Sequence, residues 1–264
     1  MELISYGWIR PVMFVGGLLF FLFWELVRPY RPTTVSKGKR WFINLALTGF
    51  NSLILNVVFG AAAVVTAVYA RDHGQGVLNI LAVPRWANFL ITIVFMDFML
   101  YVWHLLNHVV PLFWRFHRVH HTDLNMDVST ATRFHLGELS ISMVIKIALV
   151  YLLGADPVGV VVFEALLVLC AQFQHSCLAV SASLEKIVWV AGVPPSMHRI
   201  HHSVKIKERN SNYGTIFSLW DRSLGTLVKE VDQDTIKIGV GGHFDESKLG
   251  WGHLLVQPFT PSVH

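Results

Sequence analysis

Histidines are dense in one stretch of the chain, which runs from Tyr101 to Asp123 and reads YVWHLLNHVVPLFWRFHRVHHTD. The pattern of its last three histidines returns further along the chain in MHRIHHS. Two H-x-x-H-H clusters and one H-x-x-x-H cluster thus supply eight imidazoles: His104, His108, His117, His120, His121, His198, His201 and His202. Residues three and four apart share one face of a helix. Each cluster can therefore direct its rings at a single point, which is the geometry of metal ligands.

These residue types at this spacing predict metal binding, because packing many titratable rings together is unfavourable whenever they become charged. Thiolate zinc and iron–sulfur sites lack ligands, since the only cysteines are Cys170 and Cys177 and they form no CxxC pair. Eight imidazoles exceed the four ligands of a structural zinc and can surround two ions with open coordination positions. Imidazole suits iron, and iron with open positions reacts with oxygen. The leading prediction is a di-iron centre.

The composition indicates an integral membrane protein, since 53% of the residues are hydrophobic and 14% are charged. The formal charge of +4 does not indicate nucleic-acid binding, because the basic residues lie in short loops beside apolar segments. The fold expected is all-α. It is a polytopic helical bundle with about four to five membrane-embedded helices and a cytoplasmic helical cap that carries the histidine clusters.

Five apolar segments are expected to be membrane helices: 8–27, 42–70, 86–110, 139–153 and 157–174. The loop 28–40 carries five basic residues and no acid, so it should face the cytoplasm. Three crossings then return the chain to that side near Pro111, which places the metal site at the cytoplasmic boundary of the membrane. One domain, 1–264, is expected, divided into membrane spans (1–110), a cytoplasmic histidine segment (111–137), a membrane hairpin (138–175) and a cytoplasmic cap (176–264).

Charged residues inside these segments need partners, because an unpaired charge in a membrane helix is costly. Asp97 shares one helical face with Tyr101, His104 and His108. We expect it to pair with the ring of His104 or of another ligand; the alternative is a hydrogen bond between helices. Lys146 and Glu164 lie in the two arms of the hairpin and are expected to pair with each other.

The order HLLNH, HRVHH, a single His175 and HRIHH resembles the fatty acid hydroxylase superfamily, which includes sterol desaturases and sterol methyl oxidases. The resemblance spans roughly Asp97 to Thr226 and includes NSNYGTIFSLWDRSLGT as a closing block. It departs from the usual pattern at Leu105, where many members have arginine, and at HLGE (135–138), where HPxE is usual. The resemblance implies a diiron site that uses dioxygen to hydroxylate or desaturate lipids, with His175 completing the ligand set.

The resemblance also implies roles for residues around the ligands. His135 is expected either to bind metal or to orient a ligand through a hydrogen bond. Five further residues are expected to support the ligands or to fix the cap to the metal-bearing helices: Asp97, Glu138, Asn212, Tyr213 and Asp221. Four histidines without ligand spacing are expected to bind no metal: His73, His243, His253 and His264.

The reaction expected is hydrogen abstraction from a C–H bond of a lipid such as a sterol or fatty acyl chain, with O2 and two electrons consumed in each turnover. Hydroxylation is favoured over desaturation. The electrons should come from a separate donor, cytochrome b5-like or a ferredoxin with its reductase, which an acidic face could dock against Lys205, Lys207 and Arg209. The alternatives are a metal-dependent hydrolase, a bis-histidine haem protein, and a metal transport or storage protein that uses the same histidines.

Overall fold

A computed structural model describes residues 8–261, and helices make up its regular secondary structure apart from two isolated β-bridges, Pro29–Leu178 and Ser203–Ile238. The α-helices are α2 (Ile9–Val27), α3 (Lys37–Val58), α4 (Ala62–Asp72), α5 (Val77–Ile80), α6 (Arg85–Val109), α7 (Pro111–His121), α8 (Leu136–Leu153), α9 (Pro157–His175), α10 (Ala182–Ala191), α11 (Pro195–His201), α12 (Ile206–Arg209), α13 (Leu219–Leu224) and α14 (Trp251–Val256). The 3₁₀ turns are η1 (Val128–Thr132), η2 (Gln233–Thr235), η3 (Glu246–Leu249) and η4 (Gln257–Phe259).

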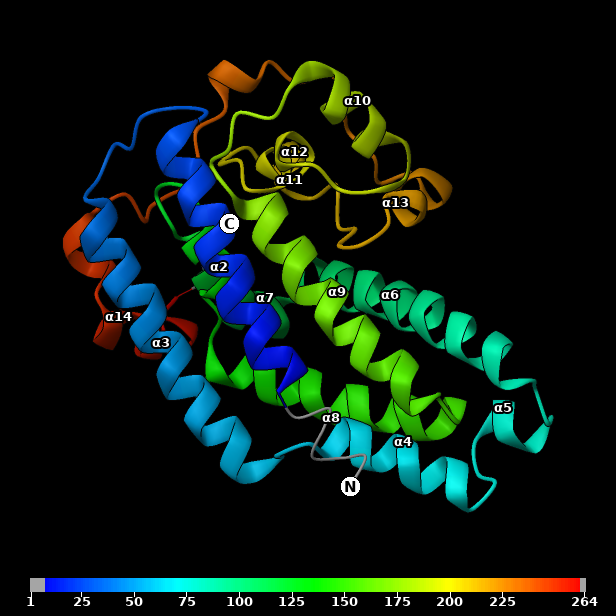
Figure 1. Ribbon diagram of the computed structural model, residues 1–264. Coiled ribbons are helices and arrows are strands. Elements are labelled where there is room, and N and C mark those ends of the chain that lie inside the picture. The colour runs from blue at the N-terminus through cyan, green and yellow to red at the C-terminus, as the bar shows by residue number, and fades with distance from the viewer. Residues whose placement is uncertain (1–7, 262–264) are drawn as a thin grey trace.

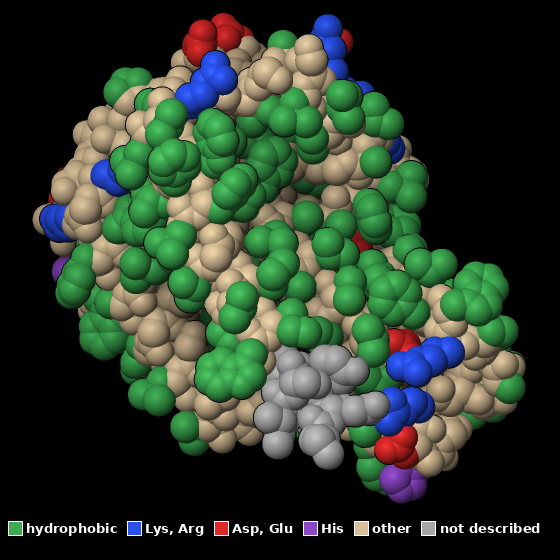
Figure 2. Space-filling model, in the orientation of Figure 1, with side chains coloured by type: hydrophobic (Ala, Val, Ile, Leu, Met, Phe, Trp, Pro, Cys, Tyr) green, Lys and Arg blue, Asp and Glu red, His purple; other side chains and the backbone are tan. Residues whose placement is uncertain are grey.

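Five segments are long and apolar enough to cross a membrane: α2, the run Lys37–Ile80, α6, α8 and α9. They match the apolar segments expected from the sequence, and they confirm an all-helical protein with several candidate membrane helices. Their outward faces are apolar, as Phe20, Phe23 and Val57 are more than half exposed. In Figure 2, hydrophobic side chains cover the middle of one face, and charged side chains lie mainly toward its margins.

Helix α9 is the central helix of this membrane part. Within its apolar window 44% of the residues are buried, against at most 28% in the other candidate spans. It packs against α2 and α6, and its C-terminal part contacts α11 (Figure 1). Its start is fixed by Asp156, whose side chain accepts a hydrogen bond from the Gly159 amide, and by Pro157 in the first turn. Helix α9 ends at His175, close to α11.

The second apolar segment is not one straight helix. It breaks between α3 and α4, where Gly60 has a φ of 49°, so that α4 runs beside α8 and α9. The loop after α4 then approaches the turn between α8 and α9 closely, and a Cβ on Gly76 would lie 2.2 Å from the Gly154 amide nitrogen. Glycine at this contact lets the two turns pack backbone against backbone.

The cap, formed by α10 to α13 and the loops between them, lies over the ends of α6 and α9 (Figure 1). The C-terminal end of α2 and the N-terminal end of α3 lie at this same end of the bundle. The polar segment 122–133 runs between them and contains η1, which contacts α2, α3 and α9. Histidine-bearing helices therefore meet where the membrane part joins the cap.

Charged residues of the membrane part are largely paired. Lys146 and Glu164 form the expected ion pair between α8 and α9, with 2.8 Å between Nζ and Oε1. The basic run 28–40, however, is not a loop of free charges, because α3 already begins at Lys37. Lys37 pairs with Glu25, and Arg40 is buried against Asp123 and Asp127. Lys37 and Arg40, two of the five basic residues in this run, are thus neutralised by acids of the protein itself.

Candidate metal centre

Four helices bring nine histidines to one place. Helix α6 carries His104 and His108 near its C-terminus, and α7 follows directly after Pro111 with the HRVHH cluster. His175 is the last residue of α9, and the HRIHH cluster lies on α11, where His202 is the C-cap. Pro111 and Pro195 stand in the first turns of α7 and α11, where a proline starts a helix without losing a hydrogen bond.

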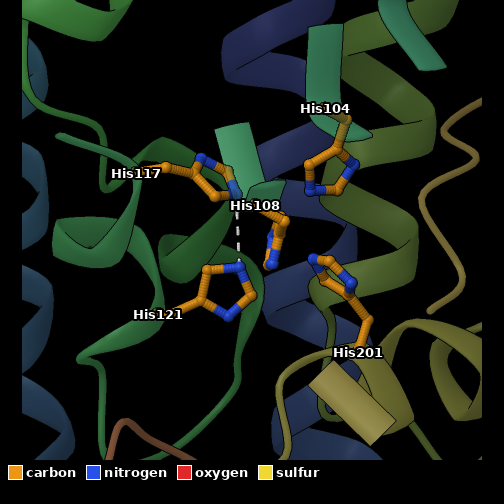
Figure 3. A group of neighbouring side chains, drawn as sticks. All are labelled: His104, His108, His117, His121 and His201. Atoms are coloured by element: carbon orange, nitrogen blue, oxygen red, sulfur yellow. Dashed lines mark hydrogen bonds between the residues drawn. The ribbon is translucent and has the colours of Figure 1, made fainter. Parts of the chain in front are cut away.

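The nine rings form two groups. We call them the five-histidine group, which contains His104, His108, His117, His121 and His201, and the four-histidine group, which contains His120, His175, His198 and His202. Within each group every residue offers one nitrogen, and these nitrogens all lie within 4.8 Å of one another. Figure 3 shows the five-histidine group, whose rings converge from α6, α7 and α11.

The two HRxHH helices contribute to both groups in opposite proportions. On α7, His117 and His121 are four residues apart and join the five-histidine group, while His120 turns to the other group. On α11, His198 and the cap residue His202 join the four-histidine group, while His201 turns to the five-histidine group. The groups are adjacent, since the rings of His121 and His202 stack with 4.4 Å between centroids. The arrangement suits two neighbouring ions.

Most rings are oriented by a hydrogen bond on the nitrogen that faces away from the group. The Nδ1 atoms of His104, His201 and His175 donate to the carbonyls of Tyr213 (2.8 Å), Ser211 (2.7 Å) and Ala171 (2.6 Å). His117 Nδ1 donates to Glu138 Oε1 (2.9 Å) and His108 Nδ1 to Asn210 Oδ1 (3.3 Å). A carbonyl oxygen can only accept, so the proton of these neutral rings is on Nδ1 and the lone pair of Nε2 points inward, as metal ligation requires.

The inward nitrogens are unsatisfied without a cation. His175 Nε2 lies 3.0 Å from His120 Nε2 and 2.9 Å from His198 Nε2. Its single lone pair cannot accept from both, and in the other group the Nε2 atoms of His104, His108 and His201 have no partner at all within the described residues. Buried lone pairs that face one another are unfavourable unless an ion lies between them. These residues therefore fit a pair of metal ions.

Burial keeps five of the rings neutral. The pKa values of His120, His121, His198, His201 and His202 lie well below the usual range, first because burial disfavours the charged imidazolium and then because neighbouring histidines repel a proton. Only neutral imidazole binds a metal. The site thus holds its donors in the form that ligation needs.

Four of the five supporting residues expected from the sequence lie at the site or hold a residue that does. Glu138 accepts directly from His117, and the Tyr213 carbonyl accepts from His104. Asp221 accepts from the Tyr213 and Gly214 amides, which fixes that carbonyl. Asn212, at a φ of 55°, donates to the Met197 and Val228 carbonyls and so fastens this loop to α11.

Asp97 does not contact a histidine, so the expectation that it pairs with a ligand ring is wrong. Its carboxylate accepts from the Ile216 and Phe217 amides and from Trp220 Nε1 (2.7 Å). Asp97 is seven residues before His104, about 10 Å along the helix axis. It fixes the cap to α6 at that distance from the rings.

His135 lies outside both groups. Its Nδ1 accepts from the Gly137 amide (2.9 Å), which caps α8, and its Nε2 donates to the Leu255 carbonyl (3.2 Å). Both ring nitrogens are therefore used by the protein backbone, and neither contacts a ligand. His73, His243 and His253 also lie outside the groups, whereas His264 falls beyond the described residues.

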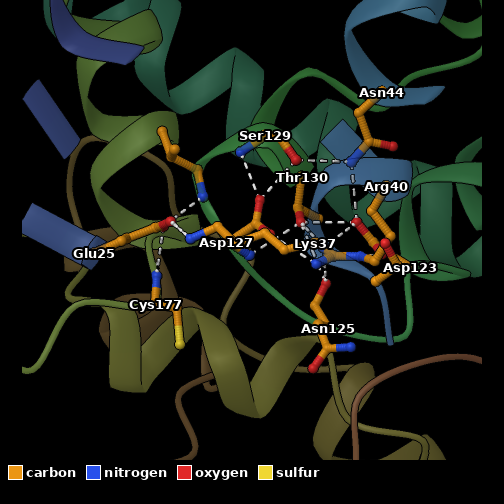
Figure 4. Close-up of polar contacts among 12 residues, drawn as sticks. Glu25, Lys37, Arg40, Asn44, Asp123, Asn125, Asp127, Ser129, Thr130 and Cys177 are labelled. Carbon is orange, nitrogen blue, oxygen red and sulfur yellow. Dashed lines mark hydrogen bonds and ion pairs between the residues drawn. The ribbon is translucent and has the colours of Figure 1, made fainter. Parts of the chain in front are cut away.

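A buried polar network below the histidines was not foreseen from the sequence. Arg40 of α3 donates to Asp123 through Nε (2.5 Å) and Nη2 (2.8 Å), and to Asp127 through Nη1 (2.7 Å) (Figure 4). Burial alone would raise the pKa of Asp123, but the adjacent charges of Arg40 and Arg133 outweigh it and hold that pKa below its usual range. Asp123 follows His121 by two residues, so the network anchors the end of α7. The only sequence feature that could have indicated this network is the polarity of the segment 122–133.

Glu25 extends this anchoring to α2. Its carboxylate accepts from the amides of Val128 and Cys177 and from Lys37 (Figure 4). One buried acid thereby joins α2, the segment that follows HRVHH, and the segment that follows His175. The positions of α7 and of the end of α9 both depend on it.

The arginine of each HRxHH cluster serves a segment far away in the chain. Arg118 donates to the carbonyls of Gln257, Thr260 (2.9 Å) and Pro261 (2.7 Å). Arg199 donates to Gln233 (2.8 Å), and its guanidinium lies 4.0 Å from the centroid of the Tyr30 ring. Each of these two helices thus directs its histidines to the two groups and its arginine to a peripheral segment.

The basic face expected around Lys205, Lys207 and Arg209 is smaller than predicted. Arg209 is 3% exposed, and its guanidinium lies over the Trp114 ring, 4.7 Å from the centroid. Lys205 pairs with Glu208 (2.9 Å). Of the three, only the two lysines are available to a partner.

Fold and site together define a polytopic helical protein whose buried histidines are arranged to bind metal. A family model described as fatty acid hydroxylase matches residues 89–226, which contain all nine histidines of the two groups. The chain belongs to the fatty acid hydroxylase family, as the resemblance implied.

Curated relatives include the ornithine lipid hydroxylase OlsE of Rhizobium tropici, 31% identical over 67% of this chain and 52% of its own length. Human cholesterol 25-hydroxylase is 29% identical over 53% of this chain and 51% of its own length. An alkylglycerol monooxygenase of Xenopus tropicalis is 26% identical over 75% of this chain and 44% of its own length. The chain thus spans about half the length of these relatives, and no solved structure matches it significantly.

Proposed function

We propose that the protein is a membrane-bound lipid hydroxylase whose two histidine groups hold two iron ions. The observation that carries this proposal is the pair of adjacent groups, in which nine imidazoles, most of them buried, present their donor nitrogens to two neighbouring points. The names of the relatives, which are hydroxylases and monooxygenases of lipids, support the same reaction class. Fewer ligands would serve a single hydrolytic zinc.

When iron is bound, it supplies the activation of dioxygen, by which R–H, O2, two electrons and two protons become R–OH and water. The chain's own residues position that chemistry. The Nδ1 hydrogen bonds fix five of the nine rings, and Glu138 makes His117 a stronger donor. Burial of the rings excludes bulk water from the centre. The apolar outer faces of α2, α3 and α6 support a site beside a bilayer, from which a lipid can enter.

The two electrons come from an external donor, cytochrome b5-like or a ferredoxin with its reductase, in this proposal. The test uses protein purified in mild detergent from cells fed with iron-57, with metal content and Mössbauer spectroscopy as readouts. We expect about two irons per chain in a coupled pair, and oxygen uptake that requires both a lipid and a reduced donor. Zinc that persists after anaerobic iron reconstitution, together with turnover without oxygen, would favour the hydrolase alternative.

The cap and the histidine groups face the cytoplasm in this proposal, because Arg28, Arg31 and Lys39 lie at that end of the bundle. A cysteine introduced at Lys207, which is exposed, is expected to react with a membrane-impermeant maleimide in inverted vesicles and not in intact cells. His73→Cys, in the exposed turn after α4, is the matched control and should show the opposite pattern. Labelling of the Lys207 position in intact cells would reverse the orientation.

A further inference from the structure

Arg209 is a buried cation that pairs with no acid among residues 8–261. Its side chain is 3% exposed, and within the described residues its Nε and Nη1 have no hydrogen-bond acceptor. The adjacent acid, Glu208, is used elsewhere, since it accepts from Ser203 (2.5 Å) and Lys205 (2.9 Å). Arginine stays charged in proteins. The contact with Trp114 offsets part of the cost of burying this charge, but far less than hydrogen bonds to an anion would.

This cation lies at the edge of the five-histidine group. The Trp114 ring beneath it is 5.1 Å from the His108 ring and 5.6 Å from the His121 ring, centroid to centroid. The next residue, Asn210, is the hydrogen-bond partner of His108. A guanidinium beside two metal ions would be repelled by them, which increases the need for a negative charge at this place.

The same edge is where the centre is least enclosed. His108 is half-buried and Asn210 is exposed, whereas the histidines of the four-histidine group are all buried. Exposed apolar side chains flank this edge along the chain: Val109 is 56% exposed, Leu112 is 59% exposed and Ile206 is 50% exposed. An unpaired cation next to exposed apolar residues suits a ligand with an acidic head and an apolar body.

We propose that Arg209 binds the acidic headgroup, phosphate or carboxylate, of the lipid on which the enzyme acts. A guanidinium matches the planar geometry and charge of such groups. The headgroup would lie beside Trp114, at the edge of the five-histidine group. The claim that the bound lipid is the substrate rests on the proposed function. The binding of an acidic lipid at Arg209 does not depend on it.

The test is equilibrium binding of lipids to the detergent-purified full chain, read by native mass spectrometry. Phosphatidic acid is compared with phosphatidylcholine of the same acyl chains, and inorganic phosphate is added in a third arm. We expect the unmodified protein to prefer phosphatidic acid, and Arg209→Gln to lose about tenfold in affinity for it, the effect of removing charged hydrogen bonds. Lys207→Gln removes an exposed charge two residues away and should bind like the unmodified protein.

Arg209→Lys keeps the charge and tests the same point if Arg209→Gln does not purify as a folded protein. We expect it to keep a preference for phosphatidic acid but to bind it more weakly than the unmodified protein does. Equal binding by the unmodified protein and the Arg209 variants, or no preference for the acidic lipid, overturns the proposal. Inorganic phosphate that competes as strongly as the lipid would assign the site to a free ion and overturn the lipid claim.

Iron content is measured on the same samples and separates this inference from the proposed function. Arg209 contacts no inward nitrogen, so Arg209→Gln should keep the iron of the unmodified protein. Absence of iron from every sample, with lipid preference still dependent on Arg209, would refute the proposed function and leave the lipid site intact. Normal iron with no dependence on Arg209 would do the reverse.

Discussion

His120→Ala and His201→Ala are each expected to lower the iron content by at least one ion and the lipid oxidation rate by about 100-fold or more, a loss at least as large as that seen for residues that only support metal ligands. His120 belongs to the four-histidine group and His201 to the five-histidine group, so the pair tests both ion positions. The measurements are metal content by mass spectrometry and oxygen uptake with lipid and donor. Membrane insertion should be unchanged, because neither ring faces the apolar exterior.

The matched control is His253→Ala. His253 is exposed on α14 and belongs to neither group. It should keep both iron and activity. Full iron content in either His120→Ala or His201→Ala would show that the corresponding group does not hold an ion.

Arg40→Met is expected to lower the free energy of unfolding by about 3–5 kcal/mol, because it leaves the buried carboxylates of Asp123 and Asp127 without their cation. Arg40 is 5% exposed and also donates to the Asn125 carbonyl (2.6 Å). The change is read from chemical denaturation in mild detergent. Iron content should fall as well, since Asp123 anchors the end of α7 two residues from His121.

Lys39→Met is the control for this change. Lys39 neighbours Arg40 but makes a surface pair with Glu246 (3.4 Å), with 52% of its side chain exposed. Exposed pairs contribute at most about 1 kcal/mol, so this variant should unfold close to the unmodified protein. Equal effects of the two substitutions would mean that the buried network adds nothing beyond surface charge.

The membrane architecture was predictable from the sequence, because it depends on local properties. The length and hydropathy of an apolar run predict a span, and Pro111 and Pro157 start α7 and α9 by restricting their own backbone. The break at Gly60 was not predictable in the same way. A glycine within an apolar run is compatible with a straight helix, and the packing of α4 on α8 and α9 decides the bend.

The histidine groups were predictable only as clusters. Spacing indicates which rings share a helical face, so HLLNH, HRVHH and HRIHH are each predicted to be a cluster. The division into five and four was not predictable, because the middle histidine of α7 turns to a group whose other members come from α9 and α11. The partners of Asp97, His135 and Arg209 were mispredicted for a related reason. Each has at least one partner in a segment distant in sequence, on which helical spacing carries no information.

The contacts of Arg118 have a consequence for the order in which parts of the protein form. A chain folds from its N-terminus as it is synthesised, and α7 is complete long before the acceptors of Arg118 at residues 257–261 leave the ribosome. His202, the last of the nine histidines, also follows all five candidate membrane segments in the chain and is synthesised after them. The histidines of α6 and α7 are therefore synthesised before the histidines of α9 and α11 with which they form the two groups. Both histidine groups are therefore complete only once His202 has been synthesised, so any iron that they hold, as proposed above, binds after that point.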